Sequence, residues 1–288
     1  MTKWSGGLID WIENDTAYLS VVFSWQLAKT YQRAIWYKSL GYKVVAGGPA
    51  VLYNPQYLKS VALVRNSMDG VLEKHNPDAT FTTRGCIRQC PFCIVPKIEG
   101  DFVELDDWKI KPIVCDNNFL ASSKFHFDSV IDKLKSIKGI DFNQGLDARL
   151  LNNYHANRLS ELDLYCVRLA WDNAKIENKV LGSLQLLMDA GIPKNKLRVY
   201  CLIGFKDTPE DALYRLETLK NLGIWVSPMR YQPLDSIKRN QYIGEYWTER
   251  ELKDYVRYWS KQRFLGHIPF KDYKSHRIYH EYSSERLI

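Results

Sequence analysis

The chain has 288 residues, enough for one large domain or one domain with extensions, and its hydrophobic fraction of 45 % is that of an ordinary globular protein. It contains no apolar run long enough to cross a bilayer and no signal-peptide pattern, so we expect a cytoplasmic protein without a membrane partner. The 40 Lys and Arg residues exceed the 33 Asp and Glu residues, and the net charge of +7 permits an anionic substrate or a nucleic acid without requiring one.

Residues 1–78 are predicted to form a strand, a helix and a second strand. Residues 17–25 are rich in β-branched and aromatic side chains, which favour a strand. Residues 26–40 carry apolar side chains at helical spacing. Residues 43–49 have the pattern of a short buried strand that runs into a turn. We therefore expect a βαβ extension at the start of the chain.

Residues 79–235 alternate between strand and helix patterns, as a parallel α/β architecture requires. Six segments are predicted to be strands: residues 79–83, 112–115, 140–143, 164–170, 197–203 and 224–230. Residues 236–288 are charged and aromatic, and we expect one helix there, from Thr248 to about Lys261. The predicted organisation is thus an extension, an α/β core and a helical tail.

Three cysteines with the spacing C-x3-C-x2-C follow the first of these six strands: Cys86, Cys90 and Cys93. A zinc site would need a fourth ligand, and the nearest histidines, His75 and His126, lack the spacing of a zinc motif. A structural disulfide does not suit a cytoplasmic chain. A cubane iron–sulfur cluster normally takes four thiolates, so three thiolates leave one iron open to another ligand.

The run from Thr83 to Pro96, in which Phe92 directly precedes the last cysteine, resembles the radical S-adenosylmethionine (SAM) superfamily. The resemblance covers about residues 79–235. It implies a [4Fe–4S] cluster on the three cysteines, whose fourth iron binds the amino and carboxylate groups of SAM. It also implies a partial (β/α)6 barrel, a one-electron reductant such as flavodoxin or ferredoxin, and a 5′-deoxyadenosyl radical that takes a hydrogen atom from the substrate.

Within the superfamily, the cysteine run is most similar to the methylthiotransferase and cobalamin-associated branch. That branch's methylthiotransferases have three further cysteines upstream, and this chain has none before Cys86. The βαβ extension resembles a shortened cobalamin-binding domain, but the D-x-H-x-x-G motif of that domain is absent. We therefore expect residues 1–78 to be a structural remnant, and the reaction stays open.

The resemblance also suggests which residues hold SAM, because reactive groups of parallel α/β folds lie at the carboxyl ends of strands. Asp116, Asn117 and Asn118 occupy the position where relatives bind the SAM amino group; the alternative is an Asx turn. Arg168, or Arg149 as its rival, would meet the SAM carboxylate; the alternative is a salt bridge to Asp147 or Asp172.

The remaining candidate contacts concern the ribose and the adenine of SAM. Asp172 or Gln144 could bond the ribose hydroxyls, and Asp147 belongs to the same polar group after the third strand. Ile203 would press on the adenine, with Phe92 at its edge. Met229 would either close the cavity or belong to the core.

The substrate is left open between three interpretations. A nucleic acid is favoured by the positive charge and by a basic, aromatic tail: Arg257, Tyr258, Trp259, Lys261, Arg263, Phe264, Lys271, Tyr273, Lys274 and Arg277. A small metabolite or peptide would leave the tail as a lid. An iron–sulfur electron carrier or sensor would need no lined cavity. The other cysteines, Cys115, Cys166 and Cys201, lie in predicted strands and are expected to be buried.

Overall fold

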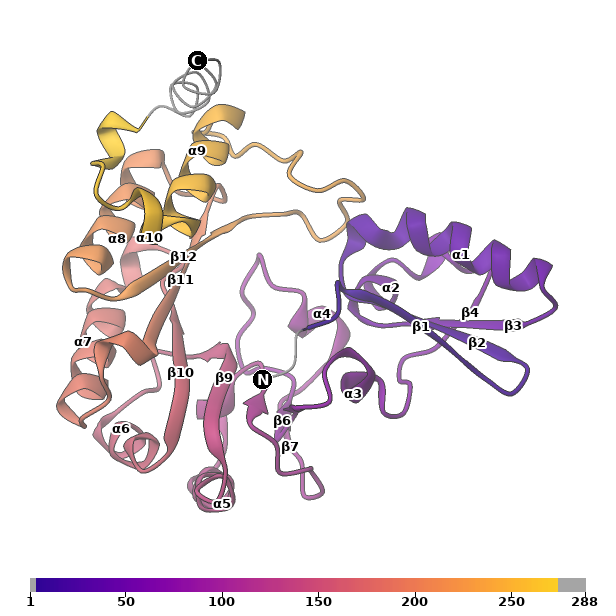
Figure 1. Ribbon diagram of the computed structural model, residues 1–288, viewed down its shortest axis with the longest axis horizontal. Helices are drawn as coiled ribbons and strands as arrows, with labels where there is room; N and C mark the ends of the chain where they lie inside the picture. The colour runs from indigo at the N-terminus through magenta and orange to yellow at the C-terminus, as the bar shows by residue number, and fades with distance from the viewer. Residues whose placement is uncertain (1–3, 274–288) are drawn as a thin grey trace, which may run out of the picture.

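The computed structural model describes residues 4–273, and its two larger sheets lie side by side (Figure 1). Residues 4–75 contain a four-stranded sheet and are here called the N-terminal module. Residues 79–230 contain a six-stranded sheet and are called the core. Lys274 and Arg277, which belong to the tail considered above, lie outside the described residues.

The N-terminal module contains the expected strand–helix–strand unit and two further strands. The unit is β2 (Thr16–Val21), α1 (Leu27–Ser39) and β3 (Lys43–Gly47), and its two strands are parallel. The additions are β1 (Leu8–Glu13), which is antiparallel to β2, and β4 (Leu63–Val64), which is parallel to β3. The short helices α2 (Pro49–Tyr53) and α3 (Val71–His75) complete the module.

The strand expected over residues 17–25 ends earlier than predicted. It stops at Val21, and Ser24–Gln26 form a short 3-10 helix that leads into α1. The apolar side chains of Phe23 and Trp25 suggested a longer strand. In the structure their rings stack on each other instead, 4.6 Å apart.

The core is a parallel sheet whose strands follow one another in chain order. All six predicted segments form strands, and each neighbouring pair is parallel. From edge to edge they are β5 (Ala79–Thr80), β8 (Ile113–Val114), β9 (Lys138–Leu146), β10 (Asp163–Ala170), β11 (Leu197–Ile203) and β12 (Trp225–Arg230). The α/β fold class is thereby confirmed.

The helices that connect the core strands lie on one side of the sheet (Figure 1). They are α5 (Lys124–Leu134), α6 (Asn153–Ser160), α7 (Glu177–Asp189) and α8 (Pro209–Asn221). Connections between parallel strands are almost always right-handed, so a sheet that grows in one direction places its helices on one side. The carboxyl ends of all six strands therefore meet at one edge, where the polar candidates of the sequence follow them.

The three cysteines outside the C-x3-C-x2-C run are buried in the core, as expected. Cys115 is 2 % exposed, and Cys166 and Cys201 are fully buried. Burial raises the pKa of Cys115 and of Cys201 to about 12, and that of Cys166 to about 11. These thiols are therefore protonated and act as small apolar side chains.

Residues 231–273 return over the core and contain the expected helix. It is α9 (Glu249–Ser260), which begins with a reciprocal cap between Thr248 and Glu251, and α10 (Gln262–Leu265) follows it. Tyr258 and Trp259, two aromatic residues of the tail, are fully buried. They are therefore not available to stack on a nucleic acid base.

Residues 231–247, here called the bridging segment, connect β12 to α9 by way of the N-terminal module. Figure 1 shows the segment reaching across to the start of α1 before it returns to α9. The Ser24 hydroxyl donates a hydrogen bond to the carbonyl oxygen of Ser236, at 2.6 Å. The guanidinium of Arg239 lies over the ring of Trp25, 5.4 Å from its centre. The segment thus holds the module and the core together.

A buried arginine braces the carboxyl edge of the core from α8. Arg215 is 1 % exposed and donates hydrogen bonds to the carbonyl oxygens of Trp171, at 2.7 Å, and Leu202, at 2.9 Å. It also pairs with Asp207 at 2.5 Å, and Asp207 in turn accepts from the backbone N–H of Gly204 at 2.9 Å. The ends of β10 and β11 are therefore fixed to each other through one side chain.

His75 gives the N-terminal module a predictable response to acid. The imidazole hydrogen-bonds the hydroxyl of Ser5 at 2.5 Å and that of Ser20 at 2.9 Å, and burial lowers its pKa below the ordinary 6.5. The unfolded chain therefore binds a proton that the folded chain resists, so stability is full above pH 6.5 and falls as the pH drops below it. We expect wild type to lose more unfolding free energy than His75→Gln between pH 7.5 and 5.5 in urea titrations. Parallel losses would exclude His75 as the cause.

Candidate functional site

The three cysteines lie on a loop whose base is closed by a short antiparallel pair. The cysteine loop, residues 85–98, runs from β6 (Thr83–Arg84) through α4 (Val95–Ile98), and β7 (Val103–Glu104) pairs with β6. Gly85 has a φ of +73°, and a Cβ on it would lie 2.2 Å from the carbonyl oxygen of Asp101. Only glycine lets the two backbones approach this closely.

Glu99 ties the two ends of the cysteine loop together. One of its carboxylate oxygens accepts hydrogen bonds from the backbone N–H of Gly85, at 2.9 Å, and from the side-chain amide of Asn117, at 2.8 Å. The other oxygen pairs with the guanidinium of Arg84 at 2.8 Å. Asn117, a candidate for SAM binding, is therefore engaged with the loop in this structure.

The cysteine thiols are free, partly buried and electrostatically coupled. Burial raises the pKa of Cys93, and the neighbouring Cys86, Cys90 and Asp172 raise it further. Burial also raises the pKa of Cys90, although the guanidinium of Arg149 acts in the opposite direction. Because a raised pKa favours the neutral thiol, no charge draws these side chains toward one another. Within residues 4–273, no group of three or more His, Cys, Asp or Glu side chains is gathered closely enough to hold a metal ion.

The three cysteines of the loop are nevertheless the type of ligand that an iron–sulfur cluster requires. Cysteine thiolates are the usual ligands of such clusters, and a bound metal deprotonates a coordinating thiol. The Asn118 side-chain amide donates to the sulfur of Cys86 at 3.5 Å, and its own carbonyl oxygen is buried without a partner. An unpaired buried oxygen beside a cysteine sulfur is a polar group left for a ligand to satisfy.

Asp147 is the centre of a charged cluster beside the cysteine loop. Its oxygens accept from Arg149 at 2.6 and 3.0 Å, from Arg88 at 2.9 Å and from Asn118 at 3.4 Å. Burial alone would raise the pKa of Asp147, but the two guanidinium groups outweigh it and lower the pKa. The side chain of Arg149 is still 34 % exposed, so it can meet a second anion.

Arg168 is paired inside the core, but not with either acid that the sequence suggested. Its guanidinium forms two hydrogen bonds with the carboxylate of Asp141 on β9, the second of them at 3.1 Å. The partners proposed from the sequence were Asp147 and Asp172. The actual partner lies on the neighbouring strand, and the pair is buried between β9 and β10.

Asp116 also has its partners within the fold. Its two oxygens accept from the backbone N–H of Thr82, at 2.6 Å, and from the Thr82 hydroxyl. The residue is 3 % exposed, and burial raises its pKa. Asp116 therefore fixes the turn between β5 and β6. An Asx turn, the alternative considered from the sequence, would instead have bonded the Asp116 side chain to the backbone of its own segment.

Asp172 lies where β10 ends, close to Arg149 and to Cys90 and Cys93. Burial raises its pKa to about 6, although Arg215 and Arg149 act in the opposite direction. At pH 7.5 the carboxylate is mostly ionised and can accept hydrogen bonds. Gln144, the other candidate for the ribose, is exposed.

The apolar candidates fall into a buried residue and two accessible ones. Ile203 is fully buried at the end of β11. Phe92, on the cysteine loop, meets the ring of Phe205 edge to face at 5.7 Å. Met229 is 48 % exposed on β12, which excludes the alternative that it belongs to the core.

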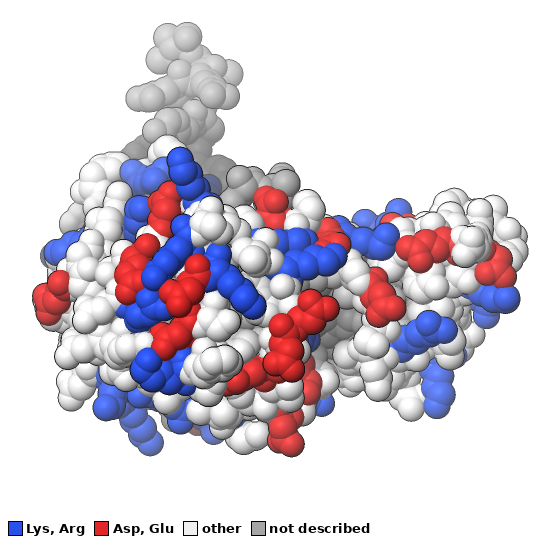
Figure 2. All heavy atoms as spheres, turned by 90° about the horizontal axis from the view of Figure 1, so that it is seen from below, with Lys and Arg blue, Asp and Glu red and all other residues white. Residues whose placement is uncertain are grey.

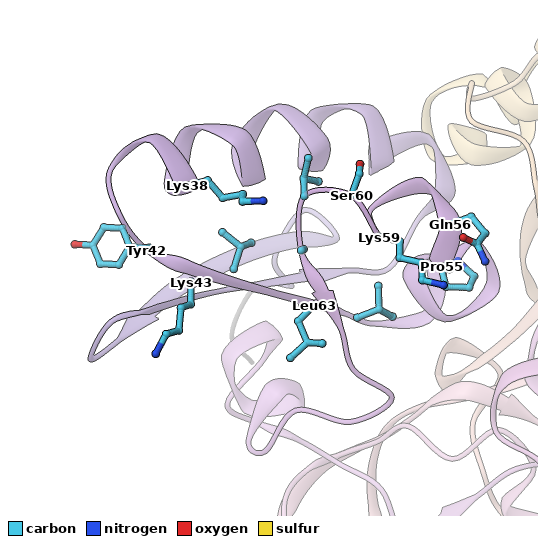
Figure 3. A pocket seen from close by; sticks show the side chains of 12 residues that line it. Lys38, Tyr42, Lys43, Pro55, Gln56, Lys59, Ser60 and Leu63 are labelled. Carbon is cyan, nitrogen blue, oxygen red and sulfur yellow. The ribbon is translucent and has the colours of Figure 1, made fainter.

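The N-terminal module carries a separate hollow of about 750 Å³ between the end of α1, β3 and β4 (Figure 3). Lys38, Lys43 and Lys59 lie around it, and Val44 and Val61 contribute apolar surface. No residue of the cysteine loop lines this hollow. It is therefore a feature of the module alone.

Comparison with known proteins adds no assignment: no model of a protein family matches the chain, and no curated protein matches it. Among residues 4–273, no helix is both long and apolar enough to span a bilayer.

Proposed function

We propose that the protein is a radical SAM enzyme that binds a [4Fe–4S] cluster through Cys86, Cys90 and Cys93. The observation that carries the proposal is the location of the cysteine loop beside residues that follow the strands of a chain-ordered parallel sheet: Arg88 bonds Asp147 at 2.9 Å, and Asn118 bonds the sulfur of Cys86 at 3.5 Å. Parallel sheets and barrels have their reactive groups at this edge. The finer fold proposed for the core is a partial (β/α)6 barrel, in which helices on one side leave the other side concave.

Held by Cys86, Cys90 and Cys93, the cluster would supply one electron to the SAM sulfonium, which would release methionine and a 5′-deoxyadenosyl radical able to take a hydrogen atom from the substrate. The electron comes from a one-electron reductant such as flavodoxin or ferredoxin. The chain must bind SAM, orient its 5′ carbon and exclude water.

The side chains at the carboxyl edge divide the binding of SAM among them. Arg149 would meet the SAM carboxylate, because its side chain stays 34 % exposed beside Asp147, whereas Arg168 is buried in its pair with Asp141. Asp172 would accept hydrogen bonds from the ribose hydroxyls, since it is mostly ionised at pH 7.5. Ile203 and Phe92 would flank the adenine, and the exposed Met229 would close the cavity.

The test is an anaerobic assay of the full chain. The protein is reconstituted with iron and sulfide, reduced with dithionite and mixed with SAM. We expect 5′-deoxyadenosine and methionine to form, and the EPR signal of the reduced protein to change when SAM is added. The unreduced sample is the control and should release neither product.

Two results would contradict the proposal. One is a protein that binds no iron under conditions that load other iron–sulfur proteins. The other is a fully loaded protein whose EPR signal SAM does not alter, which would favour an electron carrier or sensor. Changed EPR without cleavage would support SAM binding and assign the missing step to an absent substrate.

A further inference from the structure

The excess of basic over acidic residues does not make every face of the molecule a positive patch. Figure 2 shows the face at the bottom of Figure 1, where basic and acidic side chains are interspersed. At the cysteine loop the arrangement is different, because basic side chains there lie on aromatic rings. The surface concerned is called the aromatic–basic rim, and its members are Trp25, Tyr53, Lys97, Lys206, Tyr231 and Arg239.

Each of the three cations of the rim lies over a ring. The ammonium of Lys97 is 5.8 Å from the ring centre of Tyr53, and that of Lys206 is 5.5 Å from the ring centre of Phe205. The guanidinium of Arg239 is 5.4 Å from the ring centre of Trp25. Such cation–ring contacts hold a charge in place and leave it at the surface.

The rim is continuous with the cysteine loop through a chain of rings. Phe92 meets Phe205 at 5.7 Å, and Phe205 meets Tyr231 at 4.6 Å. Tyr53 of the N-terminal module joins this surface through Lys97 of the cysteine loop, which lies over its ring. Rings from the module, the core and the cysteine loop therefore form one surface.

The cations of the rim are available to an anion. Lys97, Lys206 and Arg239 are exposed, and no carboxylate of residues 4–273 forms an ion pair with them. Asp235 is the acid that faces Tyr231. On the module side, Phe23 is 41 % exposed and stacks on Trp25 with an angle of 7° between the rings. Phe23 is thus a partly exposed ring that stacks on Trp25, the same ring that Arg239 contacts.

We infer that the rim binds a single-stranded polynucleotide and brings one of its nucleotides to the cysteine loop. Cations at intervals match the phosphates of a strand, and rings between them match its unpaired bases. A small metabolite would not need contacts on three separate segments, and an acidic peptide would not need the rings. This inference rests on the proposed function for the chemistry, but not for the binding.

Binding is tested on the full chain without reconstitution, by anisotropy of a fluorescein-labelled 20-nucleotide RNA and a DNA of the same sequence. We expect log affinity to fall with log salt with a slope of roughly −2, since three cations meet phosphates. Phe23→Ala should weaken binding roughly 5- to 150-fold, as the loss of one stacked base does. Lys206→Gln should weaken binding and reduce the slope by roughly 0.7, while Lys206→Arg retains both.

Matched controls come from distant parts of the core. Phe125 on α5 is 86 % exposed, and Lys138 at the start of β9 is also exposed. Phe125→Ala and Lys138→Gln should bind as wild type does. Preference for RNA would assign the ribonucleotide as substrate, and equal binding would include DNA.

Absence of binding at 50 mM salt would overturn the inference, as would equal losses in the controls or tighter binding of an RNA duplex. Because the measurement needs neither cluster nor SAM, its failure leaves SAM cleavage intact. Conversely, a chain that binds RNA but never loads iron would overturn only the proposed function.

Discussion

Replacing Cys90 by alanine is expected to abolish cluster assembly and all SAM cleavage. The cluster needs all three thiolates of the cysteine loop. Cys90 also interacts electrostatically with both Arg149 and Asp172. After reconstitution, wild type should hold about four irons per chain and the variant fewer than about one. Iron and sulfide analysis, together with the absorption of the reconstituted protein, measures the difference.

Cys115→Ala is the matched control for this loss. Cys115 is 2 % exposed in the core, and burial raises its pKa to about 12, so its thiol is not a ligand. The control should load as much iron as wild type. Full iron in Cys90→Ala would show that the ligand set is wrong, and an equal loss in Cys115→Ala would show that a general folding defect is responsible.

The core was predictable because its strands are encoded locally. Most of the six segments are rich in apolar and β-branched residues, and side chains such as Ile113, Val199 and Val226 are buried in the sheet. β1 (Leu8–Glu13) was missed because Trp11 and Ile12 interrupt the alternation of the strand with two consecutive apolar residues. Its partner β2 was found because its residues are β-branched and aromatic.

The sequence predicted where the candidate site lies in the fold, but not which charged residues pair with each other there. The rule that strands deliver polar groups to one edge correctly brought Arg149, Asp172 and the cysteine loop together. The partners of individual charges depend on contacts between distant segments, for which the sequence has no signal. Glu99 closing the cysteine loop and Asp141 neutralising Arg168 are both of this kind.

The surface proposed to bind a nucleic acid differs between sequence and structure. In the sequence, Tyr258 and Trp259 lie among basic residues and suggested a stacking surface. Their spacing on α9 places them in the core instead, where both are fully buried. The exposed cations that lie on partly buried rings come from three separate segments, as Lys97 and Arg239 illustrate. Composition suggested a nucleic-acid partner, and the surface proposed to bind it follows from the fold.

Arg215→Ala is expected to lower the free energy of unfolding by roughly 3–5 kcal/mol, because it leaves a buried carboxylate without its partner. Arg215 is 1 % exposed, and its removal strips Asp207 of an ion pair and the carbonyls of Trp171 and Leu202 of their donors. Removing one partner of an ion pair at the protein surface costs much less free energy of unfolding. Urea titration followed by tryptophan fluorescence measures the change.

Lys253→Ala is the control, because Lys253 pairs with Glu249 at 2.6 Å on the exposed face of α9 and its removal should change stability little. Equal effects of the two variants would contradict the role assigned to Arg215. The consequence reaches the site, since Trp171 immediately precedes Asp172 and Leu202 immediately precedes Ile203. A loosened Arg215 network would release the two strand ends that position these side chains, so SAM binding should weaken even at temperatures where Arg215→Ala remains folded.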